Sequence, residues 1–70
     1  MNIIFTYHSL DQIERRGITE EEVIDAIKYS DITLKKHGKY LYRKRLNRGA
    51  IEVCCERTER DIKVITIYWE

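Results

Sequence analysis

The spacing of the hydrophobic residues changes near residue 31. Up to that point apolar residues recur three or four positions apart, as they do along one face of a helix. Beyond it they alternate with polar residues, as they do in a half-buried strand. A short apolar run at residues 3–5 precedes the first helical segment and can form an edge strand. The pattern therefore predicts an α+β domain, with helices in the first half and strands in the second.

Two helices are indicated by the residues at their ends. Thr6 is placed to cap a helix over residues 7–16, and Gly17 can end it in the left-handed conformation. Thr19 and Glu22 have the spacing of a capping box for a second helix, which fades near residue 29. The three consecutive glutamates of this first turn complement the helix dipole. We therefore interpret the glutamate run as helix-starting chemistry and not as a catalytic cluster.

The second half of the chain predicts four strands separated by turn residues. They span residues 32–36, 39–46, 50–57 and 62–69. Strands joined by short turns pair antiparallel. We therefore predict one domain over residues 1–70, in which two N-terminal helices pack on an antiparallel β-meander.

The turn between the predicted strands at residues 39–46 and 50–57 determines, by its length, which side chains of residues 39–46 face the core. A four-residue turn places Tyr42 on the core face and leaves Arg43, Arg45 and Glu52 as charges on the exposed face, with Arg45 opposite Glu52. A three-residue turn would push both arginines into the core, which is costly for unpaired cations. We prefer the four-residue turn.

Charge is distributed unevenly along the chain, although the formal net charge is only +1. Residues 32–51 contain seven basic residues and no acidic one, whereas the segments before and after carry net charges of −4 and −2. A block of this kind attracts phosphate or an acidic partner, and it is also typical of an ordinary solvated hairpin. Composition alone leaves both interpretations open.

Several classes of protein are not indicated. No apolar run approaches the ~18 residues of a membrane span, and no leader sequence is recognisable, so we expect no membrane partner and a cytoplasmic location. Cys54 and Cys55 are adjacent on a predicted strand and point to opposite faces, which disfavours a disulfide or a metal clip. His8 and His37 lie in different elements. We expect neither a metal site nor a cofactor.

The stretch HSLDQIERRGITEEEV, from His8 to Val23, resembles the signature of a family of small prokaryotic domains of unknown function. Its usual form is H-A-x-x-R-M-x-x-R-G-I-S-x-x-E-V. The segments YRKR at 42–45 and VITIY at 64–68 extend the resemblance over nearly the whole chain. That family in turn resembles the BrnT and RelE-like toxins, small α+β domains that cleave RNA and are silenced by an antitoxin. Gln12 departs from the pattern, because the family has arginine there.

The resemblance implies a toxin-like RNA-interacting protein, whose catalytic form would be a metal-independent endoribonuclease. In such a protein Arg16 would stabilise developing charge, and His8 or Tyr68 would transfer protons. Four basic side chains would hold phosphate: Arg43, Lys44, Arg45 and Arg48. If the arginine replaced by Gln12 is needed for chemistry, RNA or partner binding survives without catalysis. The alternative is a non-catalytic protein-interaction module.

The last strand predicts an interface. A four-residue turn before it places Lys63 next to Glu56 and Tyr68 on the core face. It directs Ile65, Ile67 and Trp69 away from the face that the helices cover. Burying each such side chain is worth about 1.5 to 3 kcal/mol, so a wet stripe of three is unfavourable in so short a chain. We therefore expect this stripe to line a homodimer interface or the groove for an antitoxin-like partner. The opposing expectation is that a helix or the N-terminal strand covers it.

Overall fold

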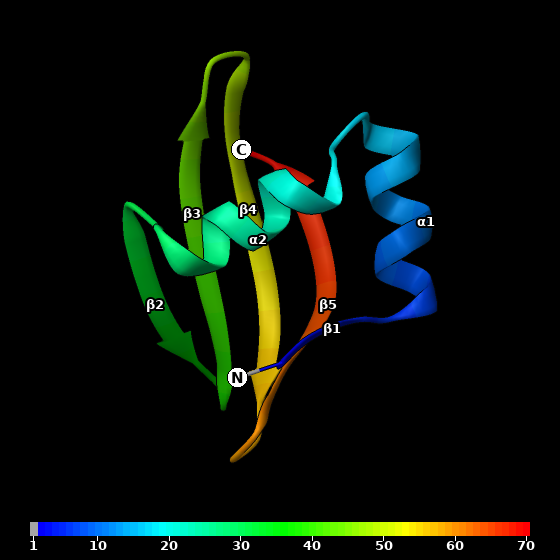
Figure 1. The fold of residues 1–70 in the computed structure, drawn as a ribbon. Helices are drawn as coiled ribbons and strands as arrows, with labels where there is room; N and C mark the ends of the chain where they lie inside the picture. Colours follow the sequence, from blue (N-terminus) through cyan, green and yellow to red (C-terminus); the bar gives the residue numbers. More distant parts are fainter. Residues whose placement is uncertain (1) are drawn as a thin grey trace.

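The computed structural model describes residues 2–70 and contains one five-stranded sheet with two helices (Figure 1). In chain order its elements are β1 (Asn2–Phe5), α1 (Tyr7–Arg16), α2 (Glu20–Lys28), β2 (Ile32–Lys36), β3 (Lys39–Leu46), β4 (Gly49–Arg57) and β5 (Asp61–Trp69). Over the part of the chain that is described, no helix is long and apolar enough to cross a membrane.

The strand order is β1-β5-β4-β3-β2, and it corrects the predicted architecture. Strands β2 to β5 form the expected antiparallel meander, but β1 pairs with β5 in parallel, so the sheet is mixed. The α+β class holds. The arrangement of two N-terminal helices on a purely antiparallel meander was wrong. The apolar run at residues 3–5 does form an edge strand before both helices, but it joins the sheet beside β5 and in parallel with it. This pairing joins segments nearly a whole chain apart, and no local pattern encodes it.

Both helices begin where their capping residues predicted, and α1 ends at the predicted Gly17, whereas α2 ends at Lys28, close to residue 29 where its helical pattern fades. The Thr6 side chain accepts a hydrogen bond from the Ser9 amide, and Gly17 ends α1 at a φ of 66° in the left-handed region. Thr19 and Glu22 form the reciprocal capping box of α2. The sequence predicts these caps correctly because a cap depends on residues three positions apart and not on the tertiary fold.

The core lies between the sheet and the helices. α2 crosses the face of β3 and β4, while α1 lies beside β5 (Figure 1). The buried apolar side chains are Ile13, Ile18, Val23, Ala26, Ile27, Tyr42, Ile51, Val53, Cys55, Ile62, Val64 and Ile67. Strand alternation directs the intervening residues to the opposite surface, which we call the open face. The residues of the open face used below are Ile32, Leu34, Leu41, Arg43, Arg45, Glu52 and Tyr68.

The β3–β4 turn is shorter than predicted. Leu46 pairs with Gly49, so the turn contains two residues and not four. This change moves the register by two positions and brings Arg43, in place of Arg45, opposite Glu52. A shift of two preserves the faces, so the prediction that Tyr42 is buried and the arginines are on the other face is confirmed.

The last strand begins as predicted and then changes phase. Four residues separate the paired residues Arg57 and Ile62, and Lys63 lies opposite Glu56. The register then shifts between Cys54 and Cys55, which leaves an extra residue of β5 without a partner. Such a bulge exchanges the faces of all residues that follow it.

This bulge overturns the predicted stripe on β5. Ile67 is fully buried in the core of its own subunit, and Trp69 packs against that core, whereas Ile65 lies at the bulge. Tyr68, which was expected on the core face, lies on the open face opposite Glu52. Ile65, Ile67 and Trp69 therefore do not form one exposed interface.

Candidate functional site

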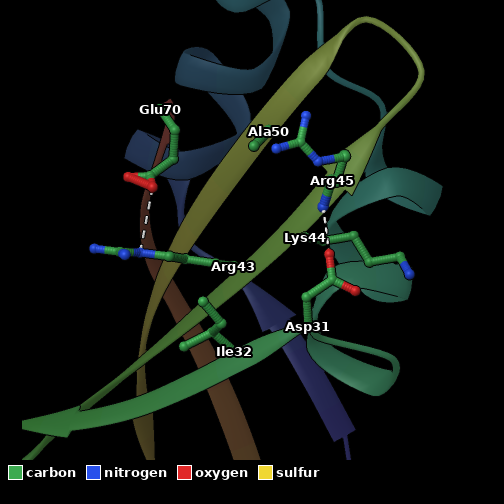
Figure 2. A pocket seen from close by; sticks show the side chains of 7 residues that line it. All are labelled: Asp31, Ile32, Arg43, Lys44, Arg45, Ala50 and Glu70. Carbon is green, nitrogen blue, oxygen red and sulfur yellow. Dashed lines mark hydrogen bonds and ion pairs between the residues drawn. The ribbon is translucent and has the colours of Figure 1, made fainter.

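A cavity of about 240 Å³ lies at the end of the sheet where β2 begins (Figure 2). Its lining residues come from β2, β3, β4 and the end of the chain: Asp31, Ile32, Arg43, Lys44, Arg45, Ala50 and Glu70. Three of these residues are basic and two are acidic. The cavity thus combines guanidinium groups with a small apolar wall, a composition suited to a ligand with both charge and hydrophobic surface.

Arg43 is held in place by two carboxylates. Its Nε lies 2.5 Å from Oε2 of Glu52 and 3.3 Å from Oε2 of Glu70. The Glu52 side chain is only 3% exposed, whereas that of Arg43 is 38% exposed. The hydrogen bond to Glu52 raises the pKa of Arg43 above its ordinary value. Arg43 therefore presents a fixed cation, anchored from below by a buried anion.

Tyr68 completes this network from β5. Its hydroxyl donates a hydrogen bond to Oε1 of Glu52, while Arg43 occupies the other carboxylate oxygen. Burial raises the pKa of Glu52, but the hydrogen bonds from Tyr68 and Arg43 outweigh it and leave that pKa below its ordinary value. The same hydrogen bond, with burial, raises the pKa of Tyr68 to about 12. At neutral pH Glu52 is an anion and Tyr68 a neutral donor.

Arg45 projects from the same face of β3 and is exposed. Its backbone amide donates a hydrogen bond of 2.8 Å to Oδ2 of Asp31, which ties the start of β2 to β3. Among residues 2–70, no carboxylate forms an ion pair with its guanidinium. Arg45 thus presents its guanidinium to an external anion on the open-face side of the cavity, which Lys44 also lines (Figure 2).

The four residues expected to hold phosphate are divided between two faces. Lys44 pairs with the buried Ile51, so its side chain lies on the face opposite Arg43 and Arg45. Arg48 lies 2.7 Å from Glu22 on α2, and its guanidinium stacks 5.1 Å from the centroid of the Trp69 ring. The structure brings only Arg43 and Arg45 together on the open face.

The three residues expected to act in catalysis do not meet. His8 is exposed on α1, where its Nε2 lies 3.0 Å from the side-chain Nε2 of Gln12. Arg16 donates a hydrogen bond of 2.8 Å to the Ile67 carbonyl and so fastens α1 to β5. Tyr68 belongs to the open face and its partner is Glu52. Glu52 was predicted as an exposed surface charge, and neither its burial nor its phenol partner was foreseen, because both depend on the bulge in β5.

The cavity has no cluster of metal ligands. Among residues 2–70, no group of three or more histidine, cysteine or acidic residues could hold a metal ion. Cys55 is buried and Cys54 half-buried. Burial raises the pKa of the Cys55 thiol to about 12, which makes it a poor nucleophile.

Comparison with known families identifies a domain family that covers most of the chain. The family described as "Domain of unknown function (DUF4258)" matches residues 5–69. The chain belongs to this family. The DUF4258 match covers both helices, strands β2 to β5 and every member of the Arg43 network except Glu70. No curated protein matches the chain, and no solved structure does.

Proposed function

We propose that this DUF4258 chain is a toxin-like RNA-interacting protein that binds the phosphodiester backbone on the open face of its sheet. One observation carries the proposal. Arg43 and Arg45 project from the same face of β3 and both line one cavity. Guanidinium groups are the preferred partners of phosphate oxygens, because their planar fork can donate two parallel hydrogen bonds.

The two arginines would act differently in this proposal. Among residues 2–70, Arg45 forms no ion pair with a carboxylate, and it would meet a phosphate first. Arg43 would bind a second phosphate after Glu70, its longer and more exposed ion pair, moves aside, whereas Glu52 stays beneath it as an anchor. A preorganised cation loses little rotamer entropy on binding, which favours affinity. Ile32 and Ala50 provide an apolar wall against which a sugar or base could pack.

The segment HSLDQIERRGITEEEV resembles the signature of a family of small domains. That family in turn resembles the BrnT and RelE-like toxins, and this second resemblance supports RNA as the anion. Cleavage of RNA has less support than binding of RNA. His8, Arg16 and Tyr68 lie on separate surfaces, and Glu52 is covered by Arg43 and Tyr68, so its carboxylate cannot reach a 2′-hydroxyl. A general base must lie within hydrogen-bond reach of the proton that it removes. The proposal is therefore binding, with phosphate contacts as its main source of affinity.

The test measures binding of a fluorescently labelled single-stranded RNA by anisotropy over a range of salt concentrations. We compare the wild type with an Arg43→Ala, Arg45→Ala double variant and with an Arg15→Ala, Arg60→Ala control. The control removes the same charge from exposed positions outside the cavity. The logarithm of the association constant falls linearly with the logarithm of the salt concentration, and the loss of two phosphate contacts should make this slope shallower by about 1.4. The control should keep the wild-type slope.

Because Arg43→Ala leaves a buried carboxylate with one partner fewer, the single Arg45→Ala variant is measured as well, with circular dichroism on every variant. Among residues 2–70, the Arg45 guanidinium forms no hydrogen bond or ion pair, and its backbone contacts persist in alanine. This variant should therefore remain folded and should reduce the salt slope by about half as much as the double variant does. Wild-type protein without salt-dependent RNA binding would refute the proposal. An equal loss in the double variant and the control would also refute it, because binding would then reflect net charge alone.

A further inference from the structure

Strand β2 is the outermost strand on the side of the sheet away from β1 (Figure 1). All five of its residues are exposed, and its only neighbour in the sheet is β3. At the opposite edge, β1 covers the first half of β5 and α1 covers the rest. The outer side of β2 has no such cover among residues 2–70, although an unpaired edge strand is a ready template for another strand.

The register shows which backbone groups of β2 point outward. The Arg43 carbonyl and the Arg45 amide point toward β2, where both bond to Asp31. Antiparallel alternation then directs the backbone groups of Ile32 and Leu34 toward β3. The N–H and C=O groups of Thr33 and Lys35 lie between these and point away from the sheet. Two donors and two acceptors are therefore in place for an added strand.

The side chains of β2 present a different chemistry on each face. On the open face, Ile32 is 47% exposed and Leu34 is 42% exposed. On the other face, Thr33 alternates with Lys35, whose ammonium lies 5.6 Å from the centroid of the Tyr40 ring. An added strand would thus meet apolar side chains on one face and a cation on the other, since opposite residues of paired strands share a face.

The outer edge of β2 could pair with a second copy of this chain or with a strand of another protein, and the charges near the edge favour the second. A second copy of the chain, paired antiparallel about Leu34, would place Lys35 of each copy opposite Thr33 of the other, so that the two Lys35 side chains become diagonal neighbours on one face. Residues 32–51 of each copy contain seven basic residues and no acidic one to offset this repulsion. Like charges across strands are destabilising, and lysine on an edge strand is a common means of preventing self-pairing. An extended segment with alternating acidic and apolar residues has the opposite effect, because its carboxylates would lie beside Lys35.

We propose that the outer edge of β2 binds an extended segment of a partner protein as a sixth strand, with apolar residues over Ile32 and Leu34 and acidic residues facing Lys35. Backbone hydrogen bonds to Thr33 and Lys35 supply the affinity, and the alternating side chains supply the selectivity. This edge does not use the guanidinium groups of Arg43 and Arg45. The two proposed surfaces share Ile32, but backbone pairing at Thr33 and Lys35 is measured separately from RNA binding.

The experiment uses the whole chain and a short synthetic peptide in which valine and glutamate alternate. A second peptide replaces glutamate with lysine, and a third has its backbone amides N-methylated. Binding is followed by NMR, and amide exchange is measured at Thr33, Leu34 and Lys35. The acidic peptide should slow exchange at Thr33 and Lys35 and leave Leu34, which already bonds to β3, unchanged. The N-methylated peptide and the lysine peptide should not protect these amides.

Two protein variants separate the edge from general charge. Lys35→Glu should weaken binding of the acidic peptide by about tenfold and improve binding of the lysine peptide, whereas Arg60→Glu, with the same charge change in the β4–β5 turn, should alter neither. Equal binding of the acidic peptide to wild type and Lys35→Glu would overturn the proposal. So would protection of Thr33 and Lys35 without peptide, which would indicate a second copy, or their protection only by single-stranded RNA.

Discussion

Glu52 is the residue on which the charge of the open face depends. Its carboxylate is almost fully buried on a surface that no helix covers, and Arg43 and Tyr68 each occupy one of its oxygens. A buried anion is retained only where such partners offset its desolvation. Since both partners come from neighbouring strands, the network also fixes the positions of β3 and β5 relative to β4.

The hydrogen bond between Tyr68 and Glu52 predicts a stability loss at alkaline pH. It raises the pKa of Tyr68 from 10.0, the ordinary value of a tyrosine side chain, to about 12. A group whose pKa is raised in the folded protein stabilises it below the unfolded pKa and loses that contribution as pH rises through the folded value. The free energy of unfolding should therefore fall as the pH rises from 10.0 toward about 12. Urea titrations at a series of alkaline pH values would measure this.

Tyr68→Phe should remove most of that pH dependence and cost about 1 kcal/mol of stability at neutral pH, because a hydrogen bond to a charged acceptor is lost at a partly exposed site. Tyr29→Phe, at an exposed tyrosine of α2's C-cap, is the matched control and should behave as wild type. A wild-type stability that stays level through this alkaline range would show that the Tyr68 bond does not persist in solution.

At the scale of elements, α1 protects the edge of β5 beyond the end of β1. The Gln12 side-chain oxygen accepts hydrogen bonds from the Ile67 amide, at 2.9 Å, and from the Thr66 hydroxyl, at 2.8 Å. Arg16 donates to the Ile67 carbonyl from the next turn of the helix. Trp69 donates from its indole nitrogen to the Arg16 carbonyl. One helix thereby satisfies groups that would otherwise form an open sheet edge.

This role of α1 predicts that two substitutions at position 12 differ in their effect on the free energy of unfolding. Gln12→Glu keeps an acceptor oxygen near the Ile67 amide and should change the free energy of unfolding by less than about 0.5 kcal/mol. Gln12→Arg removes the acceptor, because arginine cannot accept a hydrogen bond. It should cost about 1 to 3 kcal/mol and speed amide exchange at Ile67. Equal stability of the two variants would show that the acceptor is not needed.

Local interactions explain which elements the sequence predicts well. The caps at Thr6 and Thr19 act over three residues, and strand alternation acts over two, so the bounds of both helices and the burial of Tyr42 could be predicted directly. Turn length and bulge position depend on how whole strands pack. The predicted β3–β4 turn was two residues too long, so the predicted partner of Glu52 was wrong. The bulge in β5 was not predicted, and it places Tyr68 on the open face and Ile67 in the core.

At the scale of the whole molecule, the parallel pairing of β1 with β5 joins the two ends of the chain. Ile3 and Phe5 pack against the core from β1 and add apolar burial that the meander lacks by itself. A domain of this length has a total stability of only about 4 to 10 kcal/mol. A single contact across that pairing should therefore affect the cooperative unfolding of the entire chain and not of β1 alone.

Phe5→Ala tests this expectation, with Tyr7→Ala as the matched control, because Tyr7 is an aromatic neighbour that is 93% exposed. Removal of the partly buried Phe5 ring should cost about 2 kcal/mol, whereas the control should change stability by less than about 0.5 kcal/mol. Trp69, the single tryptophan, lies at the far end of β5 and reports on the sheet by fluorescence. If the ends fold as one unit, Phe5→Ala shifts the fluorescence and circular dichroism transitions to the same lower urea concentration. A fluorescence transition that stays at the wild-type midpoint would mean that β1 detaches on its own, leaving the meander and its helices as the cooperative unit.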